Sequence, residues 1–104
     1  MSLDTTTMPT YITLWNYTQQ GIENIEGSPD RLDAAMDLIE SLGGELKGFY
    51  LTMGQYDVVT VIEMPDDDAA AKLLLRLGQS GNISGETLKA WPEADYRDLI
   101  ANLP

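Results

Sequence analysis

Residues 10–17, TYITLWNY, carry apolar or aromatic side chains at five of their eight positions, and these fall on both sides of an extended chain. Because β-branched and aromatic residues favour extended backbone, this run predicts a first strand. By the same pattern, residues 45–53 and 56–64 predict a second and a third strand, and residues 82–91 predict a fourth. A Gly-Gln pair separates the second strand from the third, which indicates an antiparallel hairpin.

Two segments between these strands repeat apolar residues at helical spacing. The first segment begins with Ser28 as a candidate cap and Pro29 at the first helical position, and Gly43-Gly44 ends it. The second begins with Asp66-Asp67-Asp68, which can cap the helix in the same way and which favour the positive end of its dipole, and Gly78 ends it. Both segments are predicted to be helices.

Two shorter stretches complete the secondary-structure prediction. Residues 21–27 predict a loop or one irregular turn, and a short terminal helix is predicted after Pro92. The resulting order is β-α-β-β-α-β plus a terminal helix, which predicts an α+β fold of the ferredoxin-like kind with a four-stranded antiparallel sheet. At 104 residues the chain is one domain, expected over residues 8–104, after an unordered leader of residues 1–7.

The first strand is apolar on both of its sides. Tyr11, Trp15 and Tyr17 point one way, and Ile12 and Leu14 point the other. An antiparallel sheet with one solvated face alternates apolar with polar residues instead. Since two helices cover only one face, we expect the terminal helix to shield part of the second face and another copy of the chain to cover the rest.

Charge narrows the range of partners. Six basic and 17 acidic residues give a formal charge of −11. Binding to a nucleic acid or an anionic membrane requires clustered Lys and Arg, so neither partner is expected. No apolar run is long enough to span a bilayer and no signal segment opens the chain, so the expected location is the cytoplasm.

The absence of cysteine and histidine narrows the chemistry further. It excludes disulfides, thiolate nucleophiles, the usual zinc sites and imidazole acid–base catalysis. The adjacent acids Asp66-Asp67-Asp68 lack the alternate spacing of a calcium loop, so they indicate a helix start rather than a metal site. No metal and no cofactor are expected.

Four blocks of the sequence carry a resemblance to a known family: PTYITLWNYTQQGIENI, SPDR, GELKGFYLTMGQYDVV and GNISGETLKAW. In this order they resemble the GYD domain family, small bacterial and archaeal proteins of the dimeric α/β-barrel, ferredoxin-like superfamily. The resemblance spans roughly residues 8–100. It implies a fold and a homodimer but no reaction, because the wider superfamily includes monooxygenases, isomerases and ligand-binding regulatory modules.

The segment Gly54-Gln55-Tyr56-Asp57 is the first candidate site. As a structural corner, Gly54 would supply a positive φ, Tyr56 would pack across the sheet and Asp57 would accept hydrogen bonds from backbone amides. As a catalytic site, Tyr56 would be a donor and Asp57 a base at the mouth of a pocket. The structural interpretation is favoured, because nothing else in the segment is catalytically distinctive.

The second candidate site is the cluster Tyr11, Trp15, Asn16 and Tyr17. Aromatic residues at alternate positions line one sheet face, which in a paired barrel either surrounds a ligand or forms the dimer core. Asn16 and Glu63 are polar groups on otherwise apolar strands, and they need partners or a function if they are buried.

Three functions remain open. The preferred hypothesis is a small homo-oligomeric domain that binds an apolar or aromatic small molecule between sheet faces. The alternative is a cofactor-independent oxygenase or isomerase with Asp57 or Glu63 as its base, whose pKa burial would have to raise. The third is a regulatory module whose acidic surface meets a basic protein.

Overall fold

The computed structural model describes residues 8–104, and the predicted leader, residues 1–7, lies outside them. The elements are β1 (Thr10–Tyr17), α1 (Gln19–Glu23), a short 3₁₀ turn η1 (Ile25–Gly27), α2 (Ser28–Ser41), β2 (Glu45–Leu51), β3 (Val58–Glu63), α3 (Asp67–Gln79), β4 (Ile83–Ala90) and α4 (Glu93–Ala101).

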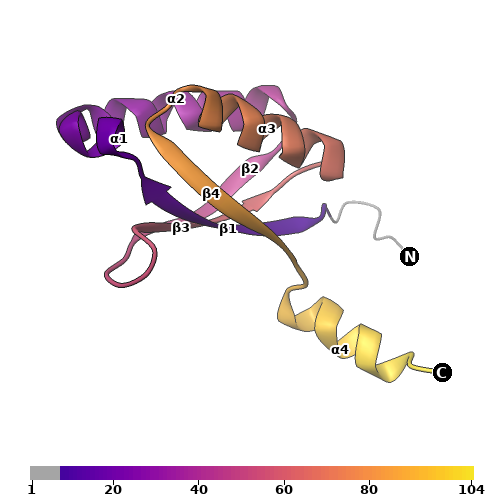
Figure 1. Ribbon diagram of the computed structural model, residues 1–104. Coiled ribbons are helices and arrows are strands. Elements are labelled where there is room, and N and C mark those ends of the chain that lie inside the picture. Colours follow the sequence, from indigo (N-terminus) through magenta and orange to yellow (C-terminus); the bar gives the residue numbers. More distant parts are fainter. Residues whose placement is uncertain (1–7) are drawn as a thin grey trace.

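The four strands form one sheet in the order β2-β3-β1-β4, and every neighbouring pair is antiparallel. α2 and α3 lie side by side over one face of this sheet (Figure 1). The predicted α+β class and the four-stranded antiparallel sheet are therefore confirmed, and the arrangement is compatible with a ferredoxin-like fold.

The core lies between the sheet and the two helices. Tyr11 and Ile62 are paired across β1 and β3, and their side chains meet the buried stripes of the helices. The fully or nearly fully buried members of this core are Tyr11, Ile39, Ile62, Met64, Ala69, Ala70 and Leu73. Odd-numbered β1 residues thus face the helices, and the even-numbered ones face the other way.

The two predicted helix starts have different outcomes. The Asp66 side chain accepts a hydrogen bond from the Ala69 amide at 2.8 Å, so the predicted cap of α3 is confirmed. The predicted cap at Ser28 is wrong. Ser28 is already helical, because η1 runs directly into α2, and Gly27 precedes the helix without any side-chain cap.

Residues 21–27 were predicted to be a loop or one irregular turn, and they contain the end of α1 followed by the 3₁₀ turn η1, so only the loop alternative is wrong. The Thr18 side chain caps α1 by accepting from the Gly21 amide at 3.1 Å, and the chain stays helical through η1. Gly21 lets α1 approach the Asn82 backbone, since a Cβ at this position would lie 2.0 Å from the Asn82 carbonyl oxygen. A helix of five residues is too short to show a helical repeat of apolar residues in the sequence.

The sheet face opposite α2 and α3 carries a central apolar band, which we call the open face: Ile12, Leu14, Val59, Val61 and Leu88. Ile12 pairs with Val61 on one side and with Leu88 on the other, so these three form one row across the sheet. Leu88 is 43% exposed, and the other four are partly buried.

The predicted terminal helix is present as α4, but it does not shield the open face. It extends away from the sheet beyond the end of β4 (Figure 1). Its apolar residues Tyr96, Leu99 and Ile100, together with Leu103 just after the helix, are 51–67% exposed. Within residues 8–104, the covering of the open face that was expected from the terminal helix is therefore missing (Figure 1).

Gly85 on β4 is the glycine on which the packing of Trp15 depends. A Cβ at Gly85 would lie 2.6 Å from Cε3 of Trp15 and 3.0 Å from Cγ2 of Thr13. The indole ring therefore lies directly over the Gly85 backbone, on the helix side of the sheet.

We predict that Gly85→Ala destabilises the fold by roughly 1–3 kcal/mol, because an indole held in the core has no room to move away from the new methyl group. The measurement is the urea midpoint at constant protein concentration, with an unchanged m value. The matched control is Gly78→Ala in α3, where no atom lies within 4 Å of the new Cβ. That control is expected to be neutral or to stabilise by up to about 1 kcal/mol. Equal midpoints for the two variants would contradict this assignment.

Candidate functional site

A cavity of about 270 Å³ lies between α2, α3 and the helix side of the sheet, and we call it the inner cavity. Most of its wall is apolar. The apolar wall includes Trp15, Leu38, Ile39, Phe49, Leu73 and Leu77. Trp15 Nε1 donates a hydrogen bond to Thr60 Oγ1 at 3.0 Å, which satisfies the indole and fixes its ring in the cavity wall.

One end of the inner cavity is polar. The polar lining residues are Tyr17, Ser28, Arg31, Ser80 and Asn82. They come from the end of β1, the start of α2 and the α3–β4 connection. Hydrogen bonds hold these segments together: the Thr18 amide donates to the Asn82 carbonyl at 3.0 Å, and Gln20 Nε2 donates to the Ser80 carbonyl at 3.1 Å.

Arg31 is the cationic group at this polar end. Its Nη1 donates to the Asn24 carbonyl at 3.0 Å. Its Nη2 is buried and has no hydrogen-bond acceptor within residues 8–104. A buried donor without an acceptor is costly, more so when the group is charged, and such groups are normally paired. No sequence pattern pointed to Arg31, because its burial depends on packing against residues far along the chain such as Asn82.

The inner cavity is partly open to water, and its wall is mostly apolar. A ligand that covered this wall would bury apolar surface and stabilise the folded state. If the ligand carried an acceptor at Arg31, it would also satisfy the Nη2 donor.

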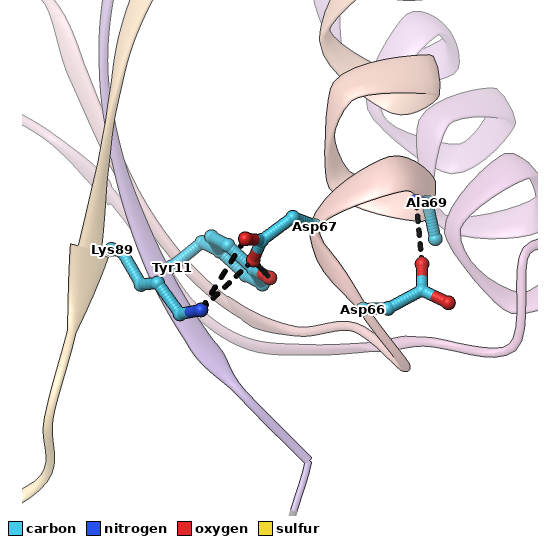
Figure 2. A network of polar contacts seen from close by, with 5 residues as sticks. All are labelled: Tyr11, Asp66, Asp67, Ala69 and Lys89. Carbon is cyan, nitrogen blue, oxygen red and sulfur yellow. Dashed lines mark hydrogen bonds and ion pairs between the residues drawn. The ribbon is translucent and has the colours of Figure 1, made fainter.

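Tyr11 belongs to a separate polar network at the start of α3 (Figure 2). The Tyr11 hydroxyl donates to Asp67 Oδ1, and Lys89 Nζ lies 3.1 Å from the same oxygen. Burial, followed by the hydrogen bond to Asp67, raises the pKa of Tyr11 to about 12. The bond from Tyr11 and the contact with Lys89 lower the pKa of Asp67. This network ties α3 to β1 and β4, and Tyr11 is not part of the inner cavity wall.

The corner at residues 54–57 has the contacts of a structural element. Gly54 has a φ of +132°, which confirms the predicted need for glycine. Asp57 Oδ2 accepts from the Tyr17 amide at 2.9 Å, and the Asp57 amide donates to the Trp15 carbonyl at 2.9 Å. Through these two hydrogen bonds, Asp57 holds the hairpin against the end of β1.

Tyr56 reaches across to β4, where its hydroxyl donates to Glu86 Oε1 at 3.0 Å. This hydrogen bond raises the pKa of Tyr56. Asn16 and Glu63 lie at opposite ends of the open face, and each is partly buried. In the strand register Asn16 is opposite Ser84, and Glu63 is opposite Thr10. The candidate bases Asp57 and Glu63, and Tyr56 with them, lie outside the inner cavity wall.

The aromatic cluster was predicted to line a sheet face directed at a second copy. Tyr11 and Trp15 instead face the chain's own helices, and Asn16 lies on the opposite side of β1. Trp15 and Tyr17 do line a cavity, but it lies inside one chain. Whether these residues bind a ligand stays a prediction.

Within residues 8–104, no group of three or more acidic side chains is arranged to hold a metal ion. No helix over the same residues is long and apolar enough to cross a membrane.

Comparison with known proteins gives two matches. The family model for the GYD domain matches residues 11–100. A protein of Thermus thermophilus, described as a glutamine synthetase and cystathionine beta-lyase binding protein, is 35% identical over 97 residues, which cover 92% of this chain and 99% of that protein. No solved structure gives a significant match.

The Tyr11 network predicts a pH dependence of stability. The pKa of Tyr11 is about 12 in the folded chain and 10.0 as the reference, so the folded state retains a proton that the unfolded state loses. Stability should fall as pH rises from 10 to about 12. Because the folded pKa of Asp67 is lowered, its contribution is present above the unfolded value and disappears as pH falls through the folded value.

Tyr11→Phe should lose roughly 1 kcal/mol at neutral pH and should flatten the alkaline part of the profile. The measurement is urea unfolding at several pH values. Tyr50→Phe is the control, since Tyr50 is 61% exposed, and it should keep the wild-type profile. Parallel alkaline profiles for wild type and Tyr11→Phe would refute the assignment.

Proposed function

Because this chain belongs to the GYD domain family, we propose that it is a binding module that works as a homodimer, with the open faces of two copies packed together. The observation that carries the proposal is the open face itself. Its apolar band is bounded by polar residues, with Glu63 at one end and Asn16 at the other. An apolar centre with a polar rim is typical of protein interfaces.

α4 supplies the second argument for a dimer. Trp91 and the apolar residues of α4 are at least half exposed, and the helix extends beyond the sheet that it could have covered (Figure 1). A twofold arrangement would place the α4 of each copy against the sheet of the other, which buries both apolar surfaces at once. A single chain that buries so little is marginally stable, so pairing would also stabilise the fold.

The oxygenase or isomerase alternative receives less support. Asp57 is engaged by the Tyr17 amide, and Glu63 lies on the face opposite the inner cavity. Neither carboxylate adjoins the one apolar space that could hold a substrate among the residues described. We therefore propose no reaction, and we place any small apolar ligand in the inner cavity rather than between sheet faces.

A partner enzyme is the second part of the proposal, and it is supported by the relative from Thermus thermophilus, which is described as binding two enzymes. α2 has a matching feature on its outer side. Asp30, Asp33, Asp37 and Glu40 recur at helical spacing, and all four are exposed. This acidic stripe would meet a basic surface on the enzyme, while the open face remains occupied by the second copy.

We expect a homodimer at low micromolar concentration, measured by size-exclusion chromatography with light scattering. Val61→Asp places a charge in the middle of the open face and should give a folded monomer, because an unpaired charge in an apolar interface is strongly unfavourable. Leu75→Asp is the control. Leu75 is 73% exposed on α3, away from the open face, so this variant should remain dimeric. A monomeric wild type, or a dimeric Val61→Asp, would refute the arrangement.

For the partner, we predict co-elution with the glutamine synthetase or the cystathionine beta-lyase of the same organism. Affinity should fall as salt rises, because exposed charges are screened. Asp33→Asn/Asp37→Asn should weaken binding several-fold, whereas the charge-matched pair Asp68→Asn/Asp98→Asn, on α3 and α4, should not. No binding to either enzyme, or equal effects of the two pairs, would contradict docking through α2.

A further inference from the structure

We propose that the inner cavity binds a small arylalkyl carboxylate, with the ring in the apolar part and the carboxylate at Arg31. This inference goes beyond the proposed dimer, because the inner cavity lies on the helix side of the sheet and the open face lies on the other side. It assigns a ligand class to the inner cavity, and it gives the protein a way to respond to a metabolite while it is bound to a partner.

The size and lining of the inner cavity indicate the ring. Its volume is about 270 Å³, close to the lower end of small-molecule sites at about 300 Å³. An apolar cavity of about 150 Å³ is enough for benzene, so this one accommodates a single ring with a short chain. Trp15 and Phe49 offer aromatic surfaces, and Leu38 and Leu77 complete the apolar wall.

Arg31 indicates the carboxylate. Its Nη1 is already used by the Asn24 carbonyl, whereas Nη2 is buried without an acceptor among the described residues. A guanidinium matches a carboxylate in both charge and geometry. The other polar residues at this end, Tyr17, Ser28 and Asn82, carry groups that can donate to the same anion. One end of the inner cavity is thus suited to an anion and the remainder to an apolar body.

The acidic residues near Arg31 do not satisfy it. Glu23 and Glu26 lie with Arg31 around a shallow groove on the outer surface. Within residues 8–104, neither forms an ion pair with Arg31, and Glu23 instead accepts from Gln19 Nε2 at 3.0 Å. The net charge of −11 opposes an anion only at long range, where physiological salt screens it within about 8 Å.

The test is isothermal titration calorimetry of the full chain with three probes: 3-phenylpropionate, 3-phenylpropanol and propionate. We expect 3-phenylpropionate to bind. The alcohol should bind at least roughly tenfold more weakly than the acid, because it lacks the charge-assisted hydrogen bond. Propionate should not bind measurably, because it lacks the ring. No binding of 3-phenylpropionate, or equal affinity for acid and alcohol, would overturn the proposal.

Two variants separate the roles of the charge and the cavity. Arg31→Gln should remove the preference for acid over alcohol, while Arg76→Gln, on α3 outside the inner cavity, should preserve it. Ala35→Phe fills the inner cavity from α2 without replacing Arg31 and should abolish binding of both aromatic probes. A retained acid preference in Arg31→Gln, or retained binding in a folded Ala35→Phe, would overturn the assignment.

The monomeric variant Val61→Asp keeps this test independent of the dimer. Val61 lies on the open face, and it is absent from the inner cavity wall. Val61→Asp should therefore bind 3-phenylpropionate as the wild type does. Loss of binding in that variant would show that the ligand site needs the second copy, and the single-chain site proposed here would be wrong.

Discussion

The main constraint on this protein is a four-stranded sheet that is apolar on both faces, although its two packed helices cover only one of them. α2 and α3 cover the face that carries Tyr11, Trp15 and Ile62. The opposite face has a row of Val61, Ile12 and Leu88 that no helix among residues 8–104 covers (Figure 1). Since exposed apolar patches on stable proteins usually mark contacts, this asymmetry is the basis of the proposed homodimer.

The two faces would then have different functions. In the proposed dimer the open face would hold two copies together, whereas the helix-covered face contains the inner cavity with Arg31 at one end. A packed domain does not normally retain both an apolar cavity and a buried donor atom without an acceptor, because each lowers its stability. Their occurrence in one place favours a bound ligand over two unrelated defects of packing.

Much of the fold could be predicted from the sequence, and the failures have physical reasons. Strand periodicity located β1 at Thr10–Tyr17, and the acidic start of α3 identified Asp66 as a cap. Ser28 was misassigned because η1 continues into α2, which local composition does not reveal. The hairpin corner at Gly54 was assigned correctly, because the turn needs a positive φ and glycine is the residue that adopts it without strain.

The candidate site was harder to predict. The side chains of a strand point alternately to the two faces of the sheet, but the sequence does not show which face the helices cover. When the side chains on both faces are apolar, as on β1, the choice depends on the tertiary arrangement, and Trp15 was placed on the wrong side for that reason. Arg31 had no sequence signal, since the burial of its Nη2 depends on residues that only the fold brings close to it, such as Asn82.

The most direct measurement is an isotope-filtered NOE experiment on a sample that mixes methyl-labelled and unlabelled copies. If a second copy covers the open face, the methyl groups of Ile12, Leu14 and Val61 will show NOEs to protons of the unlabelled chain. If these methyls show no intermolecular NOE and are instead broadened by a soluble paramagnetic agent, the open face is in contact with water and the central claim is wrong.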